Sequence, residues 1–166
     1  IPTSIRKPGQ YLEFNTSLAV RTLPANTQKV LIVGPMLSGG TKAALEAVSV
    51  FSSDEAAVYF GYGSVAHLMC IAAINSYAYL DLTVIGVADA VAGNAASGTL
   101  TITGPASSEG VISLWVGDTR VDVAVSAADT ATEMAAAVKT AIDNQPSLPV
   151  SASANLGVVT LTAKNK

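Results

Sequence analysis

Apolar residues in this sequence come in short runs, separated by glycine, proline and small polar residues. The longest run, from Val65 to Ile74, is interrupted by His67 and is far shorter than the about 20 residues of a membrane-spanning helix. Runs of this length form short strands or short amphipathic helices. The pattern therefore predicts an α+β fold built from small elements, and it predicts no membrane insertion.

The first 27 residues are expected to form an extended N-terminal arm. Pro2, Pro8 and Pro24 are incompatible with a helix through most of this segment. Polar and apolar residues alternate from Tyr11 to Leu18, which is typical of a strand. Because the arm has few local partners, we expect it to pair with a sheet edge in a neighbouring subunit. The candidate inter-subunit strand contains Tyr11, Leu12, Glu13, Phe14, Asn15 and Leu18.

Residues 28–89 are predicted to form a small mixed α/β region with the order strand, helix, helix, strand. Ser53 is expected to cap the first helix and Gly61 to end it. Ser64 is expected to cap the second helix, which runs to about Asn75. The predicted strands are Lys29–Val33 and Leu80–Val87, with Val48–Phe51 as a short strand or connection.

Small, turn-forming residues between Asp89 and Ser97 predict a domain boundary. Residues 98–166 are then expected to form a β-rich module with one helix that folds alone. Thr130 and Glu133 form a capping-box pattern at the start of that helix, and Asn144 with Pro146 stops it. The predicted strands are Thr99–Thr103, Gly110–Val116, Thr119–Val125, Val150–Ala154 and Val158–Ala163.

The composition of the chain limits the kinds of molecule that it is expected to bind. Half of the residues are apolar and 13% are charged, against a usual charged fraction of about 25%. A surface this poor in charge predicts that other subunits cover much of it. The net charge of −3, with no basic run, predicts no nucleic-acid binding. A single cysteine cannot form an internal disulfide, which suits assembly in a reducing cytoplasm.

Two patterns that can carry chemistry have simpler interpretations. The segment from Gly34 to Lys42 resembles a phosphate-binding loop, but its lysine comes two positions late and Pro35 removes a backbone donor. His67 and Cys70, three residues apart on one expected helix, have the spacing of a nucleophile pair. Their apolar neighbours favour structural roles, and no other His or Cys exists to complete a metal site.

The acidic residues and the single tryptophan of the module also have structural interpretations. Asp118 lies in an expected turn and Asp129 beside a helix cap, while Arg120 can balance Asp122 across a strand pair. Trp115 is expected in core or rim packing rather than on a ligand platform. The sequence therefore predicts no catalytic residues, no cofactor, no metal and no small-molecule ligand.

A series of short segments, kept in order along nearly the whole chain, resembles the contractile tail sheath proteins of Mu-like bacteriophages. No single motif is decisive, because sheath proteins have no catalytic signature. Residues 98–166 resemble the module inserted into those proteins, ending in Val159–Lys164. The other matching residues are Ile1-Pro2, Arg6, Pro8-Gly9, Tyr11, Glu13, Leu23-Pro24, Lys29–Gly34, Asp54–Ala56, Phe60–Ser64 and Met69.

The resemblance implies a structural protein of the virion and not an enzyme. Sheath subunits assemble with one another as rings around the tail tube, and they contract to drive the tube through the host envelope. Contacts with the tube and baseplate would involve parts outside this chain, which would be made in the bacterial cytoplasm. The chain stops at Lys166, before the family's C-terminal region, and begins at Ile1. We therefore expect a fragment, or the ordered part, of a longer subunit.

Two other functions are compatible with the residues. A baseplate or adhesin-type binding module would present a cluster of exposed aromatic side chains around Trp115 on a glycan-binding sheet. A small enzyme would expose His67 and Cys70 in a cleft and lower the pKa of the thiol.

Overall fold

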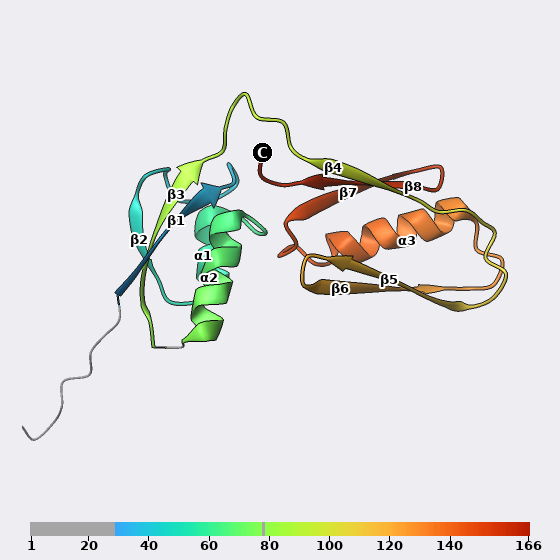
Figure 1. Ribbon diagram of the computed structural model, residues 1–166, viewed down its shortest axis with the longest axis horizontal. Coiled ribbons are helices and arrows are strands. Elements are labelled where there is room, and N and C mark those ends of the chain that lie inside the picture. The colour runs from blue at the N-terminus through green and yellow to red at the C-terminus, as the bar shows by residue number, and fades with distance from the viewer. Residues whose placement is uncertain (1–28, 78) are drawn as a thin grey trace, which may run out of the picture.

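The computed structural model describes residues 29–77 and 79–166, which form eight strands and three helices (Figure 1). The predicted α+β fold is confirmed. The candidate inter-subunit strand between Tyr11 and Leu18 lies outside the described residues. The elements are β1 (Lys29–Met36), β2 (Ala47–Val50), α1 (Ser53–Phe60), α2 (Val65–Ser76), β3 (Asp81–Ala88), β4 (Ser97–Thr101), β5 (Gly110–Val116), β6 (Thr119–Val125), α3 (Ala131–Asp143), β7 (Val150–Asn155) and β8 (Val158–Ala163).

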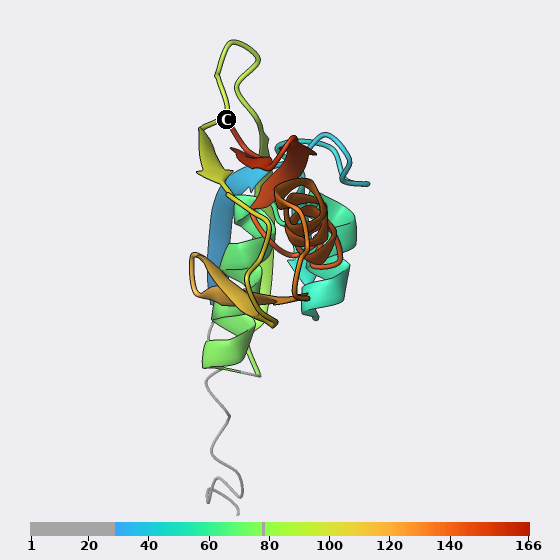
Figure 2. The same cartoon turned by 90° about the vertical axis from the view of Figure 1, so that its right-hand side faces the viewer.

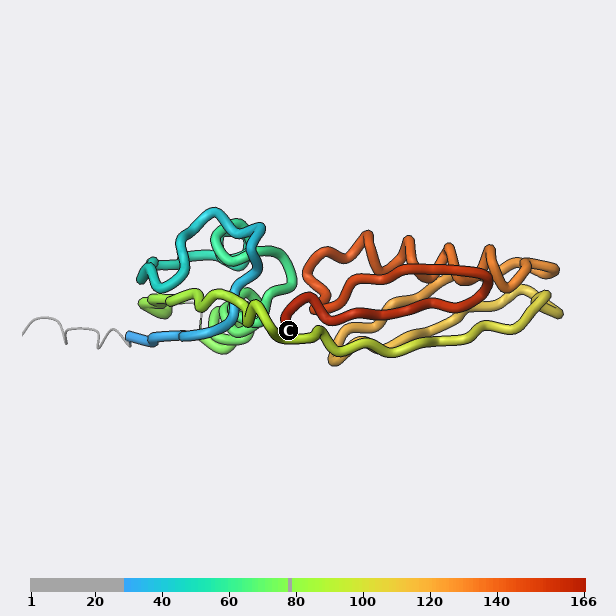
Figure 3. Tube along the Cα trace, turned by 90° about the horizontal axis from the view of Figure 1, so that it is seen from above, coloured from blue at the N-terminus to red at the C-terminus, as the bar shows by residue number. Residues whose placement is uncertain are grey.

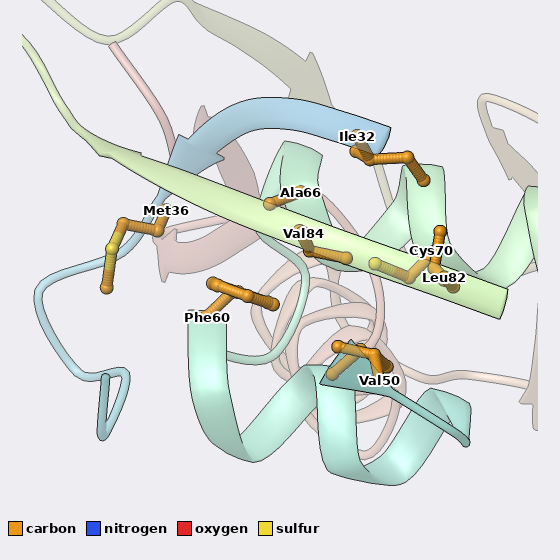
Figure 4. Packing of buried hydrophobic residues seen from close by; sticks show 9 residues of the cluster. Ile32, Met36, Val50, Phe60, Ala66, Cys70, Leu82 and Val84 are labelled. Carbon is orange, nitrogen blue, oxygen red and sulfur yellow. The ribbon is translucent and has the colours of Figure 1, made fainter. Parts of the chain in front are cut away.

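The first five elements form an α/β region around a three-stranded sheet with the order β1-β3-β2. β1 is parallel to β3, whereas β2 is antiparallel to it. Side chains alternate along each strand, so one face of the sheet packs against α1 and α2. Figure 4 shows this core, in which strand residues such as Ile32 and Val84 meet Phe60 of α1 and Cys70 of α2. The other buried members are Met36, Val50, Ala56, Ala66 and Leu82.

The helix ends of this region follow local sequence signals, with one correction. The prediction that Ser53 caps α1 is wrong, because the Ser52 side chain accepts the hydrogen bond from the backbone nitrogen of Glu55, at 3.2 Å. Glu55 in turn accepts a hydrogen bond from the backbone nitrogen of Phe51. Gly61, with φ of +91°, ends α1 as predicted. Ser64 caps α2 as predicted.

The remaining elements form a β-rich region with its own hydrophobic cluster. β4, β8 and β7 make an antiparallel sheet, and β5 pairs with β6 as a hairpin. α3 packs against β7, β8 and β6, and its capping box between Thr130 and Glu133 is confirmed. β4 begins and ends two residues earlier than predicted, because residues 97–101 are the ones that pair with β8. The buried members of the cluster are Val121, Val123, Ala135, Val138, Ile142, Leu148 and Val159.

The α/β region and the β-rich region follow one another end to end along the long axis of the molecule (Figure 3). The chain leaves β3, passes through a loop at residues 89–96 that rises away from both regions (Figures 1 and 2), and enters β4. It returns after β8, so that Lys166 lies between the two regions (Figure 3). By length and hydropathy, none of α1, α2 and α3 meets the requirements of a membrane-spanning helix.

Candidate functional site

The junction between the two regions is built around Lys164, which follows β8. Its Nζ donates hydrogen bonds to the carbonyl oxygens of Pro146 at 2.7 Å and Tyr62 at 3.1 Å. Tyr62 lies in the turn between α1 and α2, and Pro146 follows α3. Burial lowers the pKa of the Lys164 ammonium, and the charge of Asp143 partly opposes this shift. One side chain thus bonds two segments that are far apart in the sequence.

The next two residues extend the junction. The Asn165 side-chain oxygen accepts a hydrogen bond from the backbone nitrogen of Val65, at 3.0 Å. Val65 is the first residue of α2, where backbone N–H groups have no partner within the helix. The backbone nitrogen of Lys166 donates to Oδ2 of Asp89, the residue that follows β3. The β-rich region therefore begins and ends beside the same point of the α/β region.

Gly63 allows the close approach of the two regions. It has φ of +76°, and an added Cβ would lie 2.2 Å from the carbonyl oxygen of Leu148 and 2.7 Å from Lys164 Nζ. Both distances are far below van der Waals contact, so only glycine fits here. The Gly63 backbone nitrogen donates to Nδ1 of His67, at 3.1 Å. Sequence reasoning missed Gly63, Lys164 and Asn165, because no local pattern indicates contacts between residues about a hundred positions apart.

His67 and Cys70 are buried in α2, as their apolar neighbours predicted. The His67 side chain is 3% exposed, and burial lowers its pKa, with a further lowering by the charge of Lys164. Its ring contacts Tyr62 edge to face, with 6.0 Å between the centroids. Burial raises the pKa of the Cys70 thiol to about 11. A thiol that stays protonated at neutral pH is the opposite of an activated nucleophile.

The residues that resemble a phosphate-binding loop have packing roles. Gly34 lies within β1, and an added Cβ would be 3.2 Å from Cα of Ala66, so glycine lets α2 pack closely on the sheet. Lys42 pairs with Glu46 at 3.7 Å, and its Nζ lies 5.1 Å from the centroid of the Tyr59 ring. Gly34 therefore lies in a strand, where a phosphate cradle would need a loop, and Lys42 is in an ion pair, where the cradle would need a free lysine.

The outer face of the β5–β6 hairpin carries a hydrogen-bonded polar group beside the exposed Val111 and Trp115. Asp122 accepts hydrogen bonds from Ser113 Oγ at 2.6 Å and Arg120 Nε at 2.8 Å. Arg120 thus balances Asp122, but the prediction that it does so across a strand pair is wrong, because both residues lie on β6 and Ser113 is the cross-strand partner. The Ser113 hydrogen bond and the Arg120 guanidinium lower the pKa of the Asp122 carboxyl. Asp129 accepts from the backbone nitrogen of Ser126 at 2.7 Å, beside the cap of α3. These carboxylates have structural partners.

Trp115 lies outside the core, so of the two predicted roles, core or rim packing, the core role is wrong. Its side chain is 64% exposed, because Ile112, Leu114 and Val116 occupy the alternate positions of β5 that pack toward α3. Residues 98–166 contain no other aromatic residue. The exposed aromatic cluster expected of a glycan-binding sheet is therefore absent from the β-rich region.

Within residues 29–77 and 79–166, one face of the sheet of the α/β region is not covered by another element, and we call it the open sheet face. Leu31 and Val33 of β1 are 60% and 53% exposed, and Val87 of β3 is 37% exposed. The register places Val33 beside Ile85, and Ile85 beside Ala47 of β2. The apolar residues of the face are Leu31, Val33, Pro35, Ala47, Ile85 and Val87; Thr83 and Ser49 lie beside Leu31, and the Lys29–Asp81 ion pair lies at one end.

The comparison with known proteins agrees with the resemblance seen in the sequence. No family model matches the chain. Over all 166 residues, the chain is 34% identical to the protein named Mu-like prophage FluMu tail sheath protein from Haemophilus influenzae strain Rd. The chain spans 34% of the length of that relative. No group of three or more potential metal ligands occurs in residues 29–77 and 79–166. Along its whole length, this chain is thus related to one third of a Mu-like tail sheath protein, which confirms the resemblance seen in its residues.

Proposed function

We propose that the chain is part of a structural subunit of a contractile phage tail sheath. The single observation that carries this proposal is the whole-chain similarity to a tail sheath protein. Such a subunit assembles with its copies around a tail tube and contracts to drive the tube through the host envelope. It is a component of the virion, is made in the cytoplasm of the bacterial host, and is not an enzyme. Residues 1–166 correspond to its N-terminal portion, and the tube-facing and baseplate contacts lie elsewhere in the subunit.

The junction supports the proposal that residues 98–166 are an inserted domain. The connections to this region meet at Asp89 and Lys166, whose hydrogen bond measures 2.9 Å. A domain whose two ends lie close together is accommodated between adjacent residues of a host domain without disturbing it. The separate hydrophobic clusters of the two regions support the same division. The boundaries we propose are residues 1–27 for the arm, 28–89 for the α/β region and 98–166 for the inserted module.

We further propose that the arm pairs with a neighbouring subunit through the strand between Tyr11 and Leu18. A strand of about five net hydrogen bonds contributes roughly 2.5–7.5 kcal/mol before the cost of ordering it. That gives weak affinity for a single arm, and many arms in a ring raise the effective concentration of each contact. Residues 1–166 alone are therefore expected to sediment as monomers in dilute solution. A stable ring or filament of this piece would contradict the assignment.

The two alternative functions have less support. The binding-module alternative needs aromatic side chains around Trp115, and the β-rich region has none. The enzyme alternative needs an accessible thiol of low pKa, whereas Cys70 is buried and its pKa is raised to about 11. Neither alternative accounts for the similarity to a sheath protein.

Electron microscopy of the complete gene product tests the proposal. A sheath subunit expressed without its tube is expected to form helical tubes of constant diameter. Deletion of residues 1–27 from the same protein is the matched variant, and it is expected to shift the product toward unassembled subunits. A complete gene product that stays monomeric under all assembly conditions, and does not bind preformed tail tubes, would overturn the proposal.

A further inference from the structure

The open sheet face is apolar where a solvent-facing sheet surface is normally polar. Across its centre, Val33, Ile85 and Ala47 lie side by side on three strands, and none carries a polar side-chain atom. Among the described strand residues of this face, Lys29 and Asp81 at one end carry charges, with 3.9 Å between Nζ and Oδ2. In water, an antiparallel sheet usually pairs one apolar face with one polar face. In this sheet the centre of the second face is apolar as well, and the polar residues Thr83 and Ser49 lie in the neighbouring row, beside Leu31.

The β5–β6 hairpin shows how the same chain builds a strand surface that faces water. Its outer face carries the hydrogen-bonded group of Ser113, Asp122 and Arg120. The same hairpin face also exposes Val111 and Trp115, whereas on the open sheet face Thr83 and Ser49 lie beside an apolar centre. Sheets with parallel strands, such as β1 and β3, are normally covered on both faces. The apolar centre of the open sheet face, on a sheet that contains parallel strands, indicates that this face is covered in the complete subunit.

The position of Lys166 indicates what covers it. Lys166 is hydrogen-bonded to Asp89, which follows β3 directly, so the described chain ends at the carboxyl edge of this sheet. A polypeptide that continues beyond Lys166 starts beside Asp89, two residues after Val87 of the open sheet face. The sheath relative is about three times as long as this chain, since the chain spans 34% of it.

The size of the face favours cover from the same subunit over a second copy. A stable interface between separate proteins takes about 20–30 residues on each side, whereas this face has six apolar side chains. Association of separate molecules also costs translational and rotational entropy, which a segment of the same polypeptide does not lose again. We infer that the segment following Lys166 in the complete subunit packs its apolar side on Leu31, Val33, Ile85 and Val87. This inference rests on the proposal that the chain is part of a longer sheath subunit.

Thiol labelling tests the inference. Val33→Cys places a thiol at the centre of the open sheet face, and Val111→Cys places one on the exposed outer face of β5 as the matched control. The native Cys70 is buried and gives a slow background. In residues 1–166, both introduced thiols should react rapidly. In the dilute, unassembled complete subunit, Val33→Cys should react at least about 100-fold more slowly than Val111→Cys. Leu31→Cys repeats the measurement if Val33→Cys does not fold.

Three results would overturn the inference. Equal rates in the complete subunit would mean that the face stays open. Protection that appears only on assembly would assign the cover to a second copy. Protection already present in residues 1–166 would assign it to this chain itself. The labelling uses unassembled subunits, so its result is independent of the electron microscopy. Tubes with a reactive Val33→Cys would refute only the inference, and a protected thiol without tubes would refute only the sheath function.

Discussion

The backbone nitrogen of Lys166 donates a hydrogen bond to Oδ2 of Asp89 at 2.9 Å, although 77 positions separate the two residues. Together with Lys164 and Asn165, this contact brings the end of the β-rich region back to its start. The β-rich region thus begins and ends beside the same point of the α/β region.

Limited proteolysis should cut the loop at residues 89–96, where Val91 is 95% exposed. The two pieces should stay together in size-exclusion chromatography, because the junction bonds of Lys164 and Asn165 do not depend on the loop. Lys164→Met keeps the apolar stem and removes the ammonium, at an expected cost of about 1–3 kcal/mol for the unpaired carbonyls. The nicked Lys164→Met protein should therefore separate more readily. Pieces of the unaltered protein that separate at once would contradict the junction.

Gly63→Ala should destabilise the protein more than Gly117→Ala. Both glycines have positive φ, of +76° and +60°, but nothing lies within 4 Å of an added Cβ at Gly117. Gly117→Ala should therefore lose only the about 1–2 kcal/mol of left-handed backbone strain. Gly63→Ala should lose about 1–3 kcal/mol more, because its Cβ clashes with the Leu148 carbonyl oxygen. Urea unfolding of the two variants measures the difference, and equal losses would refute the close approach.

Acidification should destabilise the junction through His67. Burial and the charge of Lys164 hold the folded-state pKa of His67 below its ordinary value of 6.5, with Asp54 acting in the opposite direction. The unfolded chain therefore binds the proton first, and the free energy of unfolding falls as the pH drops below 6.5 toward the folded pKa. His67→Asn keeps an acceptor for the Gly63 backbone nitrogen but does not titrate.

Urea unfolding at pH 7 and pH 5 measures this effect. The difference between the two pH values should be larger for the unaltered protein than for His67→Asn, since the other acidic groups contribute equally to both. The same pH dependence in the two proteins would show that the His67 pKa is not lowered by folding.

Cys70 should react with a thiol reagent only as fast as the protein unfolds. Its side chain is fully buried, and its pKa is raised to about 11. Cys70→Ser should lower the free energy of unfolding by about 1–3 kcal/mol, because a hydroxyl replaces a thiol in an apolar core. Rapid stoichiometric labelling of Cys70 in the native protein would instead favour an exposed, reactive cysteine.

Local signals predicted most of the elements. The hairpin Gly110–Val116 with Thr119–Val125 has the predicted bounds, since a Gly-Asp turn fixes its register. Ser64 and Thr130 cap their helices as predicted. The predicted cap of α1, Ser53, is one residue later than the observed cap, Ser52, because both serines suit the position. Only the geometry of the helix start distinguishes these two residues.

The junction could not be predicted, for a physical reason. The hydrogen bond between Val65 and Asn165 joins residues 100 positions apart, and neither residue belongs to a pattern that requires the other. The exposed position of Trp115 also could not be predicted, because hydrophobicity alone does not indicate which face of a two-stranded hairpin a residue occupies. The role of Tyr11 to Leu18 stays a prediction, since this segment lies outside the described residues.

The hydrogen bond between Asp89 and Lys166 also determines how mechanical load passes through the molecule. In the longer subunit proposed above, a pull between β1 and the polypeptide that follows Lys166 passes through the β-rich region only if the junction breaks. While the bonds of Lys164, Asn165 and Lys166 hold, tension passes directly from the α/β region to the following polypeptide. The β-rich region then bears no tensile force. Its size and surface can therefore vary without weakening the contacts that carry the force.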